Sequence, residues 1–332
     1  MTVPTRQLGR TDMHITRVGF GAWAIGGTGW GPQDDADSVR AIRHAIDRGI
    51  NWVDTAAFYG AGRSESVVGR ALRDVPHADR PLVFTKCGLV GDDSGAPSNV
   101  MAEASVRREV DDSLRRLGVE RIDLYQVHWP PTDGTMLEDY WATMLSLRDE
   151  GKVRAVGLSN HDVKQLDVAE EIGHVDSLQP PFSLIARDAA ADLIPWCAEH
   201  ETGVIVYSPM QSGLLSGAMT AERIATLPAD DWRCTHSDFC GENGRRNLAL
   251  ADAMRPAAQR HDVPVAAVAV AWTLAWPGVT GAIVGARHPE QIDGWLPAAT
   301  LDLTTEDLDE LAAAVAATGA GSGPRHPSGG AA

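Results

Sequence analysis

The chain alternates from end to end between short apolar segments rich in β-branched and aromatic residues and longer segments with helical spacing of apolar residues. Segments typical of amphipathic helices separate the apolar runs, and glycines stand where several of these helices should end. Eight such units predict parallel strands closed into a barrel, the (β/α)₈ TIM barrel of the α/β class. The predicted strands are residues 18–23, 51–56, 82–87, 122–128, 153–160, 177–182, 203–209 and 280–286.

A two-domain dinucleotide-binding protein of the Rossmann type is the alternative. The stretch GFGAWA, residues 19–24, imitates the motif G-x-G-x-x-A. A glycine-rich loop follows it, whereas the motif requires a helix N-terminus to hold a pyrophosphate. We therefore predict one barrel domain over residues 1–318.

Three stretches lie outside the eight units. Residues 6–18 alternate around a Gly-Arg pair and predict a β-hairpin that caps the bottom of the barrel. Residues 210–246, after the seventh strand, are too long and polar for a routine connection, and they predict a functional loop. Residues 319–332 are of low complexity and are expected to be a disordered tail.

Composition excludes several classes of function. The net charge of −16 argues against binding to nucleic acid or to anionic membranes, because both need a basic face. No apolar run reaches the roughly 18 residues of a membrane span, and the first residues lack the apolar core of a signal peptide. The four cysteines are scattered without metal-ligand spacing, so we expect reduced thiols, no disulfide framework and no metal site. These features favour a soluble cytoplasmic protein.

Four side chains suited to acid–base chemistry fall near the carboxyl ends of consecutive predicted strands. Asp54 lies near the end of the second strand, Tyr59 lies in the next loop, Lys86 is near the end of the third strand, and His128 ends the fourth. Each alone has an ordinary structural explanation, such as a turn cap or a core imidazole. Together they favour a catalytic set, because active sites of these barrels lie at the carboxyl ends of the strands.

The four groups also make chemical sense together. A phenol with a pKa near 10 is a poor proton donor at neutral pH. A neighbouring ammonium should lower that pKa, and a carboxylate should keep the ammonium charged and in place. An imidazole nearby can orient a carbonyl oxygen. This arrangement predicts general acid catalysis toward a developing alkoxide, with hydride delivered by a recruited cofactor, because no side chain can deliver it.

An ordered set of short motifs carries a family resemblance. DTAAFYG, FTKCG, YQVHWP, VGLSN, LQPPF, YSPMQSGLLSG and VGARHPEQ, in this order, closely resemble the aldo-keto reductases of the bacterial type related to potassium-channel β subunits. The resemblance covers roughly residues 6–318. It implies that Tyr59 is the general acid, that Lys86 and Asp54 tune it, and that His128 orients the carbonyl group.

The resemblance also implies that NADPH binds in an extended form across the barrel mouth. It places three residues at the carboxamide, Ser159, Asn160 and Gln179, and stacks Tyr207 on the nicotinamide ring. It folds a loop over the pyrophosphate: Ser208, Pro209, Met210, Gln211, Ser212, Gly213 and Leu214. It places four residues at the adenosine end: Gly285, Ala286, Arg287 and Gln291. The expected cofactor contacts also include Gly21, Ala22, Trp23 and Asp54.

Arg287 carries the expectation of NADP rather than NAD. It begins the last helix of the barrel, where a guanidinium and a helix N-terminus together suit a 2′-phosphate. Many family members have Glu and Asn three and four residues after the glutamine that matches Gln291. This chain has Gly294 and Trp295 there, which leaves the adenine contact open.

The substrate pocket should be apolar. Trp23, Phe58, Trp129 and Trp30 lie in loops at the catalytic rim and suit a medium-sized or aromatic aldehyde or ketone. No basic cluster is expected to face this pocket, so a strongly anionic substrate is not favoured. The sequence leaves monomer and homo-oligomer undecided.

Two other classes of function are alternatives to a reductase. Potassium-channel β subunits keep the cofactor site of this superfamily while serving as partner proteins, so a regulatory or binding role is the alternative to catalysis. A metal-dependent barrel hydrolase would need clustered ligands such as His-x-His after the first strand, and the sequence has none there.

Overall fold

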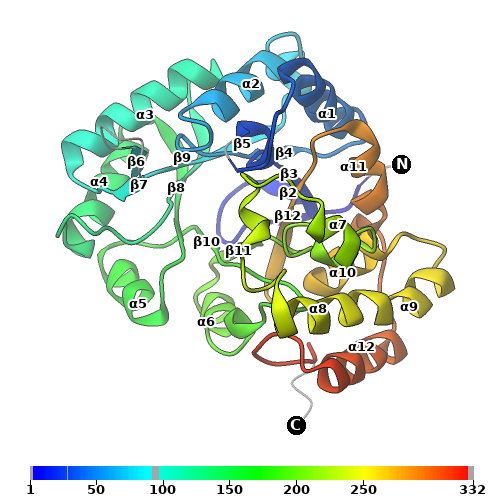
Figure 1. Cartoon of the computed structure of the whole chain (residues 1–332). Coiled ribbons are helices and arrows are strands. Elements are labelled where there is room, and N and C mark those ends of the chain that lie inside the picture. Colours follow the sequence, from blue (N-terminus) through cyan, green and yellow to red (C-terminus); the bar gives the residue numbers. More distant parts are fainter. Residues whose placement is uncertain (1–2, 28, 92–96, 328–332) are drawn as a thin grey trace.

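The structure, a computed structural model, describes residues 3–27, 29–91 and 97–327. Eight parallel strands form a closed barrel with helices around its outside (Figure 1). Pairing of β12 with β3, in which Ala282 lies beside Val18 and Gly285 beside Gly21, closes the sheet, and the predicted (β/α)₈ barrel is confirmed. In barrel order the strands are β10 (Ser177–Gln179), β11 (Gly203–Val206), β12 (Val279–Gly285), β3 (Val18–Gly21), β4 (Trp52–Asp54), β5 (Leu82–Cys87), β8 (Ile122–Val127) and β9 (Val153–Ser159).

The helices follow the alternation expected from the sequence, with ends displaced by a few residues. The α-helices are α1 (Asp35–Asp47), α2 (Arg63–Leu72), α3 (Glu103–Leu117), α4 (Leu137–Asp149), α5 (Val163–Ile172), α6 (Leu193–His200), α7 (Ala221–Ala225), α8 (Gly241–Ala253), α9 (Arg255–Arg260), α10 (Val265–Leu274), α11 (Pro289–Trp295) and α12 (Thr305–Thr318). Short 3₁₀ turns are η1 (Ala24–Gly26), η2 (His77–Asp79), η3 (Asp188–Ala190), η4 (Leu214–Ser216), η5 (Trp232–Cys234) and η6 (Leu296–Ala299).

Local sequence explains where several helices begin and end. A reciprocal capping box between Asp162 and Gln165 starts α5, and Gly118, with a φ of 67°, ends α3 in the left-handed conformation. Every residue of α10 is buried, which accounts for a sequence there with no polar face.

The N-terminal hairpin caps the barrel as predicted. Strands β1 (Thr5–Gln7) and β2 (His14–Thr16) pair antiparallel, and their loop places Gly9 against later parts of the chain. Gly9 has a φ of 54°, and a Cβ there would lie 2.7 Å from the nitrogen of Gly203 and 2.9 Å from the carbonyl oxygen of Asp176. Glycine is therefore required by both conformation and space. A separate apolar cluster joins the hairpin to the barrel strands and includes Leu8, Met13, Ile15, Trp52, Phe84 and Leu124.

Other segments differ from expectation. A second hairpin, β6 (Leu89–Gly91) with β7 (Pro97–Asn99), follows β5, and α12 packs against α8 near the end of the chain. Neither was predicted. The long loop after β11 contains α7 and two 3₁₀ turns, and α8 begins within it.

The first residues of the expected tail are ordered. Ser322 donates from its nitrogen to the carbonyl of Ile185 and accepts from the nitrogen of Arg187, each at 3.1 Å. Ala320 is buried. Residues 328–332, the remainder of the expected tail, lie outside the described residues. Within the described ranges no helix combines the length and apolarity needed to cross a membrane.

Candidate active site

Three of the four proposed catalytic residues line one cavity of about 630 Å³ at the carboxyl ends of the strands. Asp54 ends β4, Tyr59 lies in the loop that follows, and His128 directly follows β8. The fourth, Lys86, lies beneath the cavity floor in β5 and is 1% exposed. The predicted set therefore converges in space, as its position at successive strand ends implies.

Lys86 links the carboxylate to the phenol. Its Nζ donates to Asp54 Oδ1 at 2.6 Å, to the carbonyl oxygen of Thr55 at 2.9 Å and to the Tyr59 hydroxyl at 3.4 Å. All three ammonium protons thus have an acceptor. Burial lowers the pKa of Lys86, and the charge of Asp54 opposes that shift.

The pKa of Tyr59 differs from expectation. Burial, followed by the negative charge of Asp54, raises the pKa of this phenol well above 10. The Lys86 ammonium alone should have lowered it, but the ring is packed edge to face against His128, with centroids 5.6 Å apart. Tyr59 is consequently held in its protonated form, the form that a proton donor requires.

His128 is held neutral. Burial, and after it the positive charge of Lys86, lowers the pKa of His128 well below 6.5. Its Nδ1 is buried and has no hydrogen-bond partner within the part of the chain that the structure describes. A neutral imidazole can donate one hydrogen bond without adding a charge beside Lys86.

Two glutamines extend the set. Gln179 Nε2 donates to Asp54 Oδ2 at 2.9 Å and lies 3.3 Å from Gln126 Oε1, so both oxygens of the carboxylate have a donor. Gln126 is fully buried in β8, beside Lys86 in the strand register. We did not predict Gln126; its polarity inside a barrel strand was the available signal.

Asn160 and its neighbours connect the catalytic residues to the cofactor-binding residues implied by the sequence. Asn160 Nδ2 donates to the carbonyl oxygen of His128 at 2.9 Å, and its Oδ1 accepts from the Tyr207 hydroxyl at 2.8 Å. The residue has a φ of 61°. His161 fixes this turn, because its Nδ1 donates to the Ser159 carbonyl and its Nε2 accepts from Tyr140, each at 2.8 Å.

Most residues expected to contact a cofactor line the same cavity. They are Gly21, Trp23, Asp54, Ser159, Asn160, Gln179, Tyr207, Ser208, Pro209, Met210, Ser212, Gly213, Gly285, Ala286, Arg287 and Gln291. Three others do not line it. Ala22 and Leu214 are fully buried, and the amide of Gln211 is bonded to Ser183 and Asp238.

The loop that begins at Ser208 has an unusual backbone. Ser208, Gln211 and Ser212 all have positive φ, at 56°, 44° and 54°. Successive turns close it, with the nitrogen of Gln211 bonded to the carbonyl of Ser208 at 2.8 Å. Left-handed non-glycine residues are costly and concentrate at ligand sites, so this loop belongs with the cavity it lines.

Three arginines, Arg223, Arg233 and Arg287, line the cavity, of which only Arg287 was predicted. They come from α7, from η5 and from the residue shortly before α11, so their convergence depends on the fold. Arg233 is paired with Asp231 at 2.6 Å. Arg287 instead bonds to the loop of residues 30–33.

Aromatic rings wall the other part of the cavity. Trp23, Phe58, Trp129 and Trp30 line it as predicted for a substrate pocket, and Trp23 and Trp129 are 41% and 42% exposed. Trp232, which we did not predict, packs against Trp23 and Trp30 with centroids 5.8 Å away in both cases. Because Trp232 belongs to the long loop after β11, this packing places that loop against the aromatic side of the cavity.

The two positions that depart from the family pattern also line the cavity. Trp295 is 1% exposed, and a Cβ at Gly294 would meet no atom within 4 Å. The absence of a side chain at Gly294 therefore leaves open space beside Gln291.

Comparisons with known proteins agree with this geometry. Residues 17–316 match the model of the Aldo/keto reductase family. Aldo-keto reductase YhdN of Bacillus subtilis is 34% identical over 302 residues, which are 91% of this chain and 90% of that protein. An NADH-specific methylglyoxal reductase of Escherichia coli is 33% identical over 313 residues, 90% of this chain and 94% of its own length.

Solved structures give the same result. A glycerol dehydrogenase from Gluconobacter oxydans superposes with a TM-score of 0.87 at 38% identity, covering 96% of this chain and 97% of its own. The holo form of an aldo-keto reductase from Bacillus halodurans superposes with a TM-score of 0.78 at 25% identity, covering 94% and 96%. The chain belongs to the aldo-keto reductase family of oxidoreductases.

Proposed function

We propose that this protein reduces an uncharged aldehyde or ketone to an alcohol with NADPH, and that Tyr59 is the general acid. The observation that carries the proposal is the contact of one buried ammonium with both a carboxylate and a phenol at the floor of a cavity. Lys86 Nζ lies 2.6 Å from Asp54 and 3.4 Å from the Tyr59 hydroxyl. Purely structural roles do not require a buried lysine, a phenol and a neutral imidazole to lie together, so their proximity favours a catalytic role.

The cavity residues fit a nicotinamide nucleotide. Amide side chains and the ring of Tyr207 lie at the catalytic end, and the three arginines offer charge to phosphates. The cofactor supplies hydride when bound. The protein's own residues then hold the carbonyl group and supply the proton.

Each catalytic residue has one task in this proposal. His128, neutral, donates a hydrogen bond that orients the substrate carbonyl oxygen. Tyr59 gives its proton to that oxygen as negative charge develops there. Lys86, held by Asp54, places a positive charge beside the phenolate that results, so the donor's conjugate base is stabilised where it forms.

The aromatic wall favours an apolar or aromatic carbonyl compound of medium size. Trp23 and Trp129 line the cavity and expose large apolar surfaces. The reaction needs a supply of reduced nucleotide, and the four cysteines are unpaired. Both features favour the cytoplasm as the compartment in which the protein acts.

The test is oxidation of NADPH and of NADH in the presence of a carbonyl panel. The panel should include aromatic aldehydes and methylglyoxal, with glycerol as a substrate for the reverse reaction. Turnover with aromatic aldehydes supports the proposal. Cofactor binding without turnover across the panel would instead favour a binding or regulatory role.

Arg287→Ala should weaken NADPH binding about 10- to 100-fold, because hydrogen bonds to charged groups contribute about 1.5–3 kcal/mol. NADH binding should weaken much less, since NADH has no 2′-phosphate. Fluorescence titration with both cofactors measures the two dissociation constants, and Arg115→Ala, on the outer face of α3, is the control. Equal losses for the two cofactors would show that Arg287 does not recognise the phosphate.

The pH profile should reflect the neutral state of His128. Because its pKa is lowered below 6.5, the ring gains a proton only at more acid pH, and kcat/KM for reduction should not fall around pH 6.5. Rates measured from about pH 5 to about pH 8 test this. His128→Gln should have a lower rate, and its pH profile should show no inflection caused by titration of an imidazole. An inflection near pH 6.5 that vanishes in His128→Gln would contradict the assignment.

A further inference from the structure

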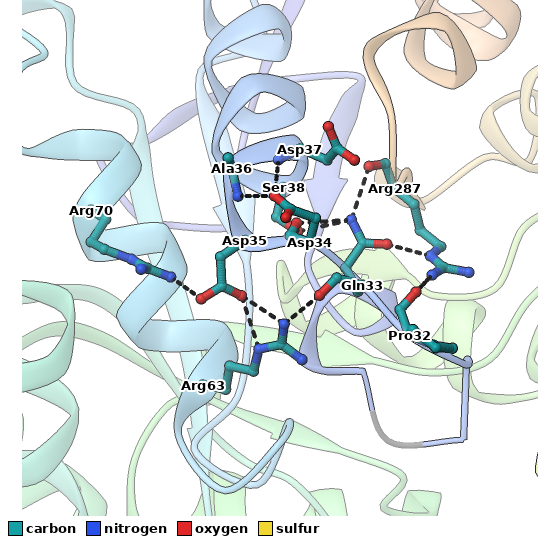
Figure 2. Close-up of polar contacts among 10 residues, drawn as sticks. All are labelled: Pro32, Gln33, Asp34, Asp35, Ala36, Asp37, Ser38, Arg63, Arg70 and Arg287. Carbon is teal, nitrogen blue, oxygen red and sulfur yellow. Dashed lines mark hydrogen bonds and ion pairs between the residues drawn. The ribbon is translucent and has the colours of Figure 1, made fainter.

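Arg287 is the cavity residue on which the prediction of NADP from the sequence depends, and three of its five guanidinium N–H groups are bonded within the protein. Its Nε donates to Gln33 Oε1 at 2.5 Å, its Nη1 donates to the Trp30 carbonyl at 2.9 Å, and its Nη2 donates to the Pro32 carbonyl. Figure 2 shows the Gln33 amide lying against the Arg287 side chain. Residues 30–33, in the loop between β3 and α1, are thus hydrogen-bonded to Arg287, in the segment that follows β12. We call this set of contacts the clasp.

The orientation of the Gln33 amide is fixed by its other contacts. Gln33 Nε2 donates to the Ser38 hydroxyl at 3.0 Å and to the Arg287 carbonyl at 3.2 Å. Because the amide nitrogen has acceptors on that side, the amide oxygen is the atom presented to the guanidinium. The Gln33 carbonyl in turn accepts from Arg63 Nη2 at 2.5 Å, so the backbone is held as well.

The acceptors that hold Arg287 are all uncharged. Among the described residues no carboxylate lies within ion-pair distance of its guanidinium. Asp35, drawn in Figure 2 on the other side of Gln33, is paired with Arg63 and Arg70, and Asp231, whose charge acts on Arg287, is paired with Arg233. Burial, and after it the charge of Arg233, lowers the pKa of Arg287. This cation therefore lies in a place where an anion would be a better partner than an amide oxygen.

We propose that Gln33 determines cofactor specificity by competing with the 2′-phosphate of NADPH for the Arg287 guanidinium. The inference rests on the proposed function, in which a nicotinamide nucleotide binds in this cavity. With NADH, the clasp stays closed and Arg287 keeps its three neutral acceptors. With NADPH, Arg287 exchanges the Gln33 oxygen for a charged one. The net preference for NADPH is the difference between these two interactions.

The experiment compares two substitutions that change the strength of the competitor in opposite directions. Gln33→Leu removes the acceptor at similar size, and Gln33→Glu replaces it with a charged acceptor of the same shape. Both also remove the amide donor to Ser38 and to the Arg287 carbonyl, so an effect common to the two variants belongs to that donor and an opposite effect to the acceptor. Dissociation constants of NADPH and NADH are measured by fluorescence titration of the full chain, without turnover. Gln259→Leu and Gln259→Glu, on the exposed face of α9, are the matched controls.

Gln33→Leu should tighten NADPH about fivefold relative to NADH, which corresponds to one ordinary hydrogen bond. Gln33→Glu should weaken NADPH about tenfold or more, because it must break an ion pair with Arg287, and should leave NADH within about twofold. In an Arg287→Ala background neither Gln33 change should alter the NADPH to NADH ratio.

The outcomes separate this inference from the proposed function. If the unaltered protein binds both cofactors and both Gln33 variants shift the two dissociation constants by the same factor, Gln33 is only structural and the inference fails alone. If the unaltered protein binds neither cofactor, the proposed function fails and the inference with it.

Discussion

Tyr59→Phe is expected to slow carbonyl reduction by about 10²- to 10⁴-fold while leaving the dissociation constant of NADPH nearly unchanged. The substitution removes the proton and keeps the ring, so the packing against His128, with centroids 5.6 Å apart, is preserved. Single-turnover measurements with an aromatic aldehyde isolate the chemical step from cofactor release. Fluorescence titration on the same variant measures binding.

Tyr207→Phe is the matched comparison. It also removes a phenol oxygen from the cavity, one that donates to Asn160 at 2.8 Å rather than contacting Lys86. It should cost less in the chemical step than Tyr59→Phe does. If Tyr59→Phe retained turnover within a few-fold of the unaltered protein, the proton would have to come from another group and the mechanism would be wrong.

Lys86→Met is expected to abolish measurable reduction and to lower the free energy of unfolding by about 3–5 kcal/mol. The side chains of Lys86 and Asp54 are 0% and 4% exposed, so the variant leaves a buried carboxylate without its cation. Chemical denaturation and the rate of NADPH oxidation measure the two effects separately. Lys152→Met, which breaks an exposed ion pair with Asp111, should cost only about 0–1 kcal/mol.

A double variant separates stability from catalysis. Lys86→Met combined with Asp54→Asn removes both charges and should recover much of the lost stability, because no unpaired ion remains. It should not recover the rate, since no positive charge then stabilises the phenolate. Recovery of both together would mean that Lys86 acts on folding alone.

The barrel could be predicted because its signal is local and repeated. Strands such as β9 and β12 are buried on both faces, so their sequences are nearly continuous apolar runs, and the regular alternation of such runs with helical segments identifies them. The helix α12 was missed although Leu311 and Val315 have helical spacing and Thr304 caps it. The β6–β7 hairpin gave no comparable signal, because its strands are three residues each.

The convergence of the proposed catalytic set could be predicted from the sequence for the same reason, but its electrostatics could not. Strand ends fix where Asp54, Lys86 and His128 lie. The direction of the Tyr59 pKa depends on how deeply the ring is buried, and rings from distant segments decide that. A lysine at 3.4 Å does not outweigh desolvation there.

The contact between Arg287 and Gln33 was the least accessible from sequence. Gln33 lies 254 positions before Arg287 in the chain, and the two meet only because β12 closes onto β3. The convergence of Arg223 and Arg233 on the same cavity was missed on similar grounds, since a loop with weak periodicity gives no indication of which way it folds.

The cap at the barrel bottom has a consequence for how the protein is made. The hairpin is synthesised before the segments it docks on, because Gly9 lies against the backbone of Asp176 and Gly203, and Arg6 donates to the carbonyl of Val279. At translation rates of about 5–20 residues per second, those docking partners emerge tens of seconds later. An isolated two-stranded hairpin is only marginally stable in water, so residues 5–16 remain undocked until those partners have been made. The bottom of the barrel can therefore close only once β12 has been made, and until then the apolar side chains of the hairpin, Leu8, Met13 and Ile15, lack the surface that buries them.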